Sequence, residues 1–163
     1  MTGSKERLEL IEVDAGLPVS RPPEGFAPVR SWELASTAQL RTLRHELADE
    51  IGAGTGSARQ DLEATPDKLV LIATELAANA LTHGLPPTSV ALSRTDEQWL
   101  LDVADHDPES EPVYAGARIT GAGGLGLHLA RQLSLEVGWY TTGTTKNIWA
   151  TFGTAEATSA PAA

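Results

Sequence analysis

Residues 75–84 read Glu75-Leu76-Ala77-Ala78-Asn79-Ala80-Leu81-Thr82-His83-Gly84 and end a longer segment with helical periodicity. At the start of that segment, Thr65 and Pro66 suit an N-cap and the first position of a helix. The apolar residues that follow recur at the spacing of a buried helical stripe, at Leu69, Ala73, Leu76 and Ala80. We therefore expect one helix, which the glycine and the prolines of Gly84-Leu85-Pro86-Pro87 bring to an end.

Glu75 and Asn79 are four residues apart and so lie on one side of the expected helix. Both fall at the edge of the apolar stripe, where a side chain can face a cleft. A carboxylate in that position can act as a general base, and an amide oxygen can bind Mg²⁺ that is shared with phosphates. On spacing alone, an ordinary exposed pair on a helix is the simpler explanation of these residues.

A glycine-rich segment, Gly121-Ala122-Gly123-Gly124-Leu125-Gly126-Leu127, leads directly into another expected helix. Glycines allow the backbone to approach a phosphate closely, and the free N–H groups of a first helical turn favour negative charge. The segment is not a dinucleotide-binding fingerprint, because no strand comes immediately before it, and it lacks the Gly-Lys-Ser/Thr of a Walker A loop. A flexible connector with a helix cap is the alternative.

The third candidate is Asp105, which ends an apolar strand within Asp102-Val103-Ala104-Asp105-His106-Asp107-Pro108. A carboxylate in a half-buried pocket can accept a hydrogen bond from an exocyclic amino group such as that of adenine. A polar turn before proline is the simpler explanation. A metal site at Asp105, His106, Asp107 and Glu109 is disfavoured, because no second cluster has ligand spacing.

The remaining pattern predicts an α+β fold. A helix from the N-cap Ser36 to Gly52 and a second helix from Leu125 to Gly138 join the one described above. Strands are expected at residues 29–34, 90–93, 99–104, 139–142 and 147–152. Together they give a two-layer sandwich, in which a mixed, mainly antiparallel sheet is covered on one face by about three helices. We expect a partly flexible extension at residues 1–28, with an extended linker at 17–25, one domain at 29–153 and a flexible tail at 154–163.

Composition limits the classes of function. The chain has 12 basic and 22 acidic residues and a net charge of -10, which argues against direct binding of nucleic acid or of anionic lipid. It has no cysteine, so a disulfide framework and a thiolate site are both excluded. No apolar run resembles a signal peptide or approaches the ~20 residues that span a bilayer. We expect a cytoplasmic protein that binds other proteins.

The order and spacing of the three motifs resemble the N, G1 and G2 boxes of the GHKL ATPases, which have the Bergerat ATP-binding fold. Glu-x-x-x-Asn-Ala-x-x-His-Gly comes first, a strand ending in Asp follows, and Gly-x-Gly-Gly-x-Gly-Leu then opens a helix. The resemblance covers about residues 28–153. Within this superfamily the chain is most similar to the short anti-sigma-factor type of serine kinase, including the ending Gly143-Thr144-Thr145-Lys146-Asn147-Ile148-Trp149-Ala150-Thr151-Phe152.

The resemblance implies a role for each motif. Glu75 is expected to be the catalytic base, Asn79 the Mg²⁺ ligand and Asp105 the carboxylate that recognises adenine. The phosphates of ATP are expected to lie against Gly121, Gly123, Gly124, Leu125, Gly126 and Leu127. The same pocket is expected to include His83, Asp107 and Asn147. Asp107 stands where the superfamily pattern has a glycine, and Asn147 stands where it has a threonine.

The resemblance also implies partners. Such a protein sequesters a sigma factor and phosphorylates a serine or threonine of an anti-anti-sigma (STAS-type) protein, and it can form a homodimer. Two other functions stay open. One is a non-catalytic module that binds ATP or a protein, which the residues at 107 and 147 motivate. The other is the catalytic domain of a histidine kinase.

Overall fold

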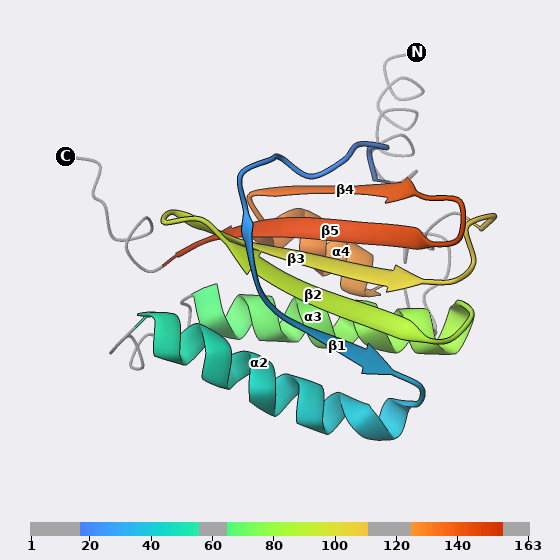
Figure 1. The fold of residues 1–163 in the computed structure, drawn as a ribbon, viewed down its shortest axis with the longest axis horizontal. Coiled ribbons are helices and arrows are strands. Elements are labelled where there is room, and N and C mark those ends of the chain that lie inside the picture. The colour runs from blue at the N-terminus through green and yellow to red at the C-terminus, as the bar shows by residue number, and fades with distance from the viewer. Residues whose placement is uncertain (1–16, 56–64, 111–124, 155–163) are drawn as a thin grey trace, which may run out of the picture.

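The computed structural model describes residues 17–55, 65–110 and 125–154. In these ranges five strands form one open sheet in the order β1-β2-β3-β5-β4, and every pair of neighbouring strands is antiparallel. The strands are β1 (Ala27–Leu34), β2 (Thr88–Arg94), β3 (Gln98–Asp105), β4 (Glu136–Thr141) and β5 (Lys146–Gly153). Figure 1 shows β3 and β5 in the middle of the sheet, with β1 at one edge and β4 at the other.

Three α-helices of the described residues pack together on one face of this sheet: α2 (Leu40–Thr55), α3 (Thr65–His83) and α4 (Leu125–Leu133). A single 3-10 turn, η1 (Thr37–Gln39), leads into α2. The helix α3 is central, because it contacts α2 and α4 as well as β2, β3 and β5. In Figure 1 the helices α3 and α4 lie behind the sheet. The predicted two-layer α+β fold is confirmed.

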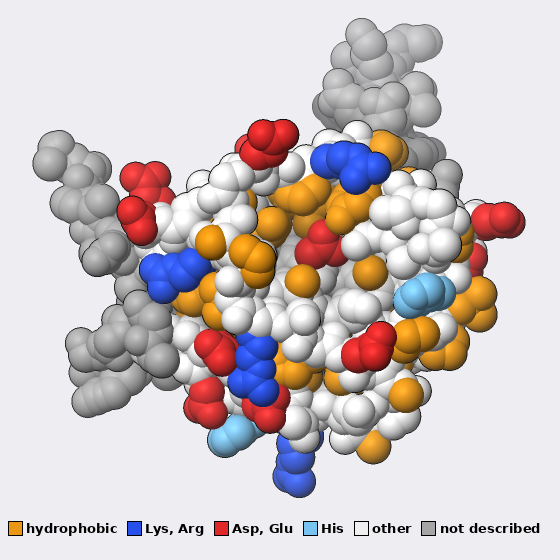
Figure 2. Space-filling model, in the orientation of Figure 1, with side chains coloured by type: hydrophobic (Ala, Val, Ile, Leu, Met, Phe, Trp, Pro, Cys, Tyr) orange, Lys and Arg blue, Asp and Glu red, His pale blue; other side chains and the backbone are white. Residues whose placement is uncertain are grey.

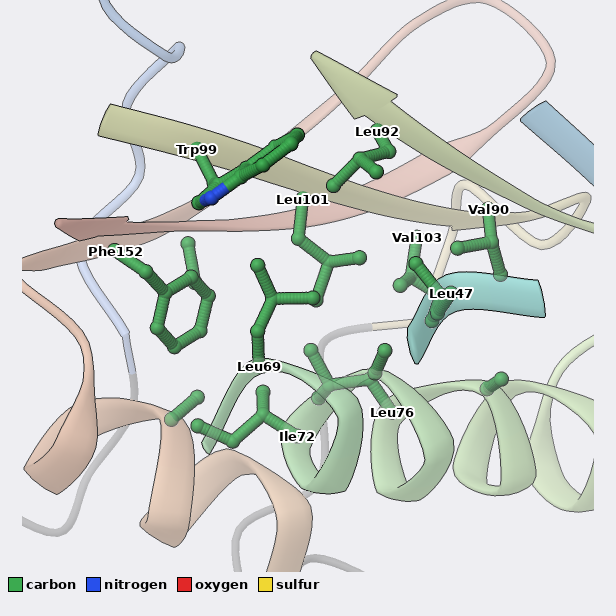
Figure 3. Close-up of a cluster of buried hydrophobic side chains, with 14 of the residues drawn as sticks. Leu47, Leu69, Ile72, Leu76, Val90, Leu92, Trp99, Leu101, Val103 and Phe152 are labelled. Atoms are coloured by element: carbon green, nitrogen blue, oxygen red, sulfur yellow. The ribbon is translucent and has the colours of Figure 1, made fainter. Parts of the chain in front are cut away.

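The core lies between the helices and the sheet (Figure 3). Alternate residues of β3, Trp99, Leu101 and Val103, are almost fully buried and meet Leu69, Ile72 and Leu76 of α3. Burial of one such side chain contributes about 1.5 to 3 kcal/mol to folding, so this contact fixes α3 against β3. The residues that alternate with the core of β3, such as Asp102, face away from the helices.

Helix α4 differs from the prediction, because it ends at Leu133 and not at Gly138. The N–H of Leu135 donates to the carbonyl oxygen of Thr151, and β4 then pairs with β5 from Glu136 onward. Gly138 is therefore a strand residue. A β-carbon at this position would lie 2.9 Å from the indole of Trp149, so close packing explains the glycine.

The beginning and the end of the described chain also differ from the expected linker and tail. Leu17 is buried, the N–H of Ser20 donates to the Trp139 carbonyl oxygen at 2.9 Å, and the Trp149 indole N–H donates to the Ser20 carbonyl oxygen at 2.7 Å. Residues 17–20 thus extend the sheet at the free edge of β4. Thr154 is buried and its N–H donates to the Glu97 carbonyl oxygen. The first part of the expected extension, residues 1–16, lies outside the described residues.

In the described ranges, none of the helices combines the length and the apolar character that are needed to cross a membrane.

Candidate functional site

A pocket lies where the C-terminal half of α3 meets the ends of β3 and β5 and the first turn of α4. Most of its wall is apolar, and a few polar groups converge on it, as is typical of small-molecule sites. The apolar lining consists of Leu76, Ala80, Val103, Leu127 and Ile148. The polar side chains that line it are Asn79, His83, Asp105 and Lys146.

Asp105 ends β3 and is only 4% exposed. Its Oδ1 accepts a hydrogen bond from the backbone N–H of Asp107 at 2.8 Å, and its Oδ2 lies 3.5 Å from the Nζ of Lys146. Burial raises the pKa of Asp105 above its ordinary value, and the Asp107 N–H and the Lys146 ammonium oppose this effect. The carboxylate is thus an acceptor in the pocket lining that is held in place by the Asp107 N–H and lies beside the Lys146 ammonium group.

Gly84 directly follows α3 and continues its hydrogen bonding, because its N–H donates to the Ala80 carbonyl oxygen at 2.9 Å. A β-carbon at this position would lie 2.3 Å from Oδ2 and 2.8 Å from the β-carbon of Asp105. Only glycine leaves room for the carboxylate against the end of α3. The two elements are also joined beyond this point, where the N–H of His106 donates to the Leu85 carbonyl oxygen at 2.9 Å.

Helix α3 presents its polar residues in a row. Asn79 and His83 are one turn apart, and both line the pocket. Glu75 lies one turn before Asn79 on the same side of the helix and is partly buried. It is not among the residues that line the pocket, so it stands next to the site and not within it.

The glycine-rich segment is described only at its end. Gly121, Gly123 and Gly124 lie outside the described residues, whereas Leu125 and Gly126 are the first two residues of α4. Leu127, the third, is buried and lines the pocket. The N-terminal turn of α4 therefore lies beside the pocket, and the N–H groups of a first helical turn favour a negatively charged ligand.

Comparison with known families finds a match that spans residues 34–152, which include α2, α3, α4, β2, β3, β4 and nearly all of β5. The matching model describes the histidine kinase-like ATPase domain. This chain belongs to that family. A search of curated proteins finds no match. Membership implies an ATP-binding domain of the GHKL type, and it agrees with the five-stranded antiparallel sheet and the helices on one of its faces.

The types of residue that line this pocket fit an adenine nucleotide. The apolar wall can cover a base, Asp105 can accept from an amino group, and α4 begins where phosphates could lie. For Mg²⁺, the amide oxygen of Asn79 is a suitable ligand, with phosphate oxygens and water supplying the others. No cluster of three or more His, Asp or Glu side chains suited to a metal occurs in the described ranges.

Asn147 was expected in the nucleotide pocket, but the structure places it on the opposite face of the sheet. Its Nδ2 donates to Oδ1 of Asp102 at 2.8 Å, and the Tyr140 hydroxyl donates to Oδ2 of Asp102 at 2.8 Å. Neighbouring strand residues point to opposite faces, so Lys146 faces the pocket and Asn147 faces away. Asn147 is therefore not among the residues that line the pocket.

The face of the sheet that carries Asp102 is turned to the viewer in Figure 2, where an acidic side chain lies near the centre, bordered by hydrophobic ones. Burial raises the pKa of Asp102 above its ordinary value, although its hydrogen bonds from Asn147 and Tyr140 oppose the rise. Both oxygens of the Asp102 carboxylate accept hydrogen bonds from side chains of β4 and β5, so the role of this cluster is to stabilise the sheet.

Asp107 contributes to the site through its backbone. Its N–H holds Asp105, whereas its own carboxylate accepts a hydrogen bond from the Ser110 hydroxyl at 2.7 Å and does not line the pocket.

Sequence reasoning did not identify Lys146 as a residue of the site. A signal was present, since Lys146, Ile148, Ala150 and Phe152 alternate along β5 and the last three are apolar. A lysine on the apolar face of a strand needs a polar partner inside the protein.

Proposed function

We propose that this chain is an ATP-dependent protein serine/threonine kinase of the anti-sigma type. The observation that carries the ATP part of the proposal is the position of Asp105, which is buried against Gly84 and lines a pocket that Asn79 also lines. The observation that supports phosphoryl transfer is the placement of Glu75 one turn away from Asn79. A base next to the site, and not inside it, leaves room for the hydroxyl of a protein substrate.

The residues divide the work of the reaction. Asp105 accepts a hydrogen bond from the adenine amino group. The apolar wall, which includes Leu127 and Ile148, excludes water from the base. Asn79 would hold Mg²⁺ together with the phosphates, and the metal would supply positive charge that neutralises the γ-phosphoryl group. Glu75 takes the proton of the acceptor hydroxyl, and the oxygen of that hydroxyl bonds to the γ-phosphorus. The bond from that phosphorus to the β–γ bridging oxygen breaks, and ADP leaves.

The proposed protein substrate is an anti-anti-sigma (STAS-type) protein, and the proposed binding partner is a sigma factor. A net charge of -10 favours a protein partner with a basic surface over nucleic acid. We place this activity in the cytoplasm, where both partners act. Homodimerisation is also proposed on the resemblance to this type of kinase.

The kinase activity is tested by transfer of labelled phosphate from ATP to candidate anti-anti-sigma proteins of the native host. We expect Glu75→Gln to bind ATP as the wild type does and to lose about 10²- to 10⁴-fold in transfer rate. Glu97→Gln, in the exposed turn between β2 and β3, is the matched control and should transfer normally. Equal transfer by the Glu75→Gln variant and the wild type would contradict the assigned role.

A second function, a non-catalytic binding module, is favoured by one observation. Lys146 already lies beside the Asp105 carboxylate, so the pocket is partly neutralised without any nucleotide. In that case a sigma factor would bind equally well with and without Mg-ATP, and transfer to every candidate partner would be absent. A pull-down from host extract, with and without ATP, separates the two functions.

A further inference from the structure

Lys146 has an unusual position for a lysine. It is the first residue of β5, pairs in register with Asp105 of β3, and is only 7% exposed. Its side chain lies on the helix-facing side of the sheet and lines the same pocket as Asn79 and His83. Lysine is almost never buried to this extent unless its ammonium group is paired.

The ion pair with Asp105 uses only part of the capacity of this ammonium group. Its Nζ lies 3.5 Å from Oδ2 of Asp105, whereas charge-assisted hydrogen bonds are shorter, at about 2.7 to 2.9 Å. An ammonium group has three donors. Within the described part of the chain, Asp105 is the one acceptor found for it. The pocket therefore holds a cation with donors to spare, and a bound ligand can supply the acceptor.

We propose that Lys146 is a second base-reading residue of the nucleotide site and donates a hydrogen bond to N1 of adenine. The proposal rests on the function proposed above, in which Asp105 accepts from the 6-amino group of the same base. Adenine carries this donor and the N1 acceptor on neighbouring ring atoms. On the neighbouring strands β3 and β5, Asp105 presents an acceptor for the 6-amino group, and Lys146 presents a donor for N1. The pair is thus complementary to one edge of adenine.

Asp105 and Lys146 together disfavour the binding of guanine and hypoxanthine. In those bases the oxygen at position 6 is an acceptor and N1–H is a donor, so an acceptor would face an acceptor and a donor would face a donor. The carboxylate would face O6, and the ammonium would face N1–H. Since Asp105 is held by the Asp107 N–H and packed against Gly84, it cannot turn away without disturbing both contacts. Lys146 therefore contributes to the choice of base as well as to affinity.

The test uses single-atom analogues of ATP with the full chain and Mg²⁺, and measures affinity by titration calorimetry. In 1-deaza-ATP a C–H replaces N1, and in purine riboside triphosphate the 6-amino group is missing. We expect the wild type to bind either analogue about 10- to 100-fold more weakly than ATP, the range for hydrogen bonds to charged groups. Inosine triphosphate, which reverses both positions, should bind more weakly than either.

Variants assign the two losses to separate residues. Lys146→Met removes the ammonium group and keeps an unbranched side chain, so it should bind ATP and 1-deaza-ATP with nearly equal affinity. Its preference for ATP over purine riboside triphosphate should remain, because that preference depends on Asp105. Lys68→Met, in the first turns of α3 and away from the pocket lining, is the matched control and should discriminate as the wild type does.

The outcomes separate this proposal from the one on which it rests. ATP binding with no penalty for 1-deaza-ATP in the wild type would overturn the role of Lys146 alone. An equal 1-deaza-ATP penalty in the wild type and in Lys146→Met would do the same. Absence of ATP binding by the wild type would overturn both proposals. If Lys146→Met fails to fold because Asp105 is left unpaired, the variant Asp105→Asn/Lys146→Met, which removes both charges, takes its place. This variant should show no penalty for either analogue. A retained 1-deaza-ATP penalty would contradict the role of Lys146.

Discussion

Replacing Gly84 by alanine should damage both the stability and the nucleotide affinity of this protein. The new β-carbon would lie 2.3 Å from Oδ2, 2.4 Å from Cγ and 2.8 Å from Cβ of Asp105. Rotation of the carboxylate could relieve the first two contacts. It cannot relieve the third, because the β-carbon of Asp105 is fixed by the pairing of β3 with β5. The end of α3 must therefore move away from the end of β3.

Such overpacking costs about 1 to 3 kcal/mol, which corresponds to a fall in melting temperature of roughly 2 to 12 °C in a chain of this size. Displacement of Asp105 should also weaken ATP binding by roughly tenfold to a hundredfold, the value of a hydrogen bond to a charged group. Thermal unfolding and labelled-ATP binding measure the two effects. Gly143→Ala is the matched control, since its β-carbon would meet nothing within 4 Å. Identical melting and ATP affinity for the two variants would refute the packing of Asp105 against Gly84.

Two further predictions concern stability. Burial raises the pKa of Asp102, so the native state binds more protons than the unfolded state. The free energy of unfolding should therefore fall as pH rises from the ordinary aspartate pKa through the raised pKa of Asp102. Asp102→Asn removes this loss, so the stability of the variant relative to the wild type should increase with pH in urea titrations; parallel profiles would contradict the assignment. The hydroxyl of Thr88 is buried and has no hydrogen-bond partner within the described structure, so Thr88→Val should stabilise the protein by about 1 kcal/mol. Thr151→Val is the control and should destabilise it, because the Thr151 hydroxyl accepts from the Glu136 N–H at 3.1 Å; a loss of stability in both variants would count against the prediction for Thr88.

The parts of the fold that local physics determines could be predicted from the sequence. Thr65, Pro66 and the apolar spacing after them define α3, and alternation of apolar residues defines β2 and β3. Spacing was enough to place Glu75 and Asn79 on one side of a helix, and Asn79 lines the pocket. His83 also lines the pocket, but it was expected there only from the family resemblance. Asp105 could be identified because it ends an apolar strand that leads into a turn.

What could not be predicted depends on contacts between distant segments. The choice between Lys146 and Asn147 is a question of strand register, because a shift of one residue exchanges the two faces of β5. The similarity in motif drew attention to Asn147, whereas the pairing of Lys146 with Asp105 decides which side chain reaches the pocket. The end of α4 was misplaced for a related reason, since pairing with β5 converts residues 136–138 into strand.

The attachment of residues 17–20 to β4 is also a long-range effect. Prolines and charged residues in that region are typical of a linker, and local sequence carries no sign of the hydrogen bonds that Ser20 makes with Trp139 and Trp149. Tertiary contacts override the local preference here.

Equilibrium dialysis with labelled ATP and Mg²⁺ tests whether the pocket at Asp105 binds ATP. We expect saturable binding of one ATP per chain by the wild type, and a loss of affinity of at least about tenfold in Asp105→Asn, whose amide can turn a donor toward the adenine amino group. Unchanged affinity in Asp105→Asn, or no saturable binding by the wild type, would contradict ATP binding at this pocket.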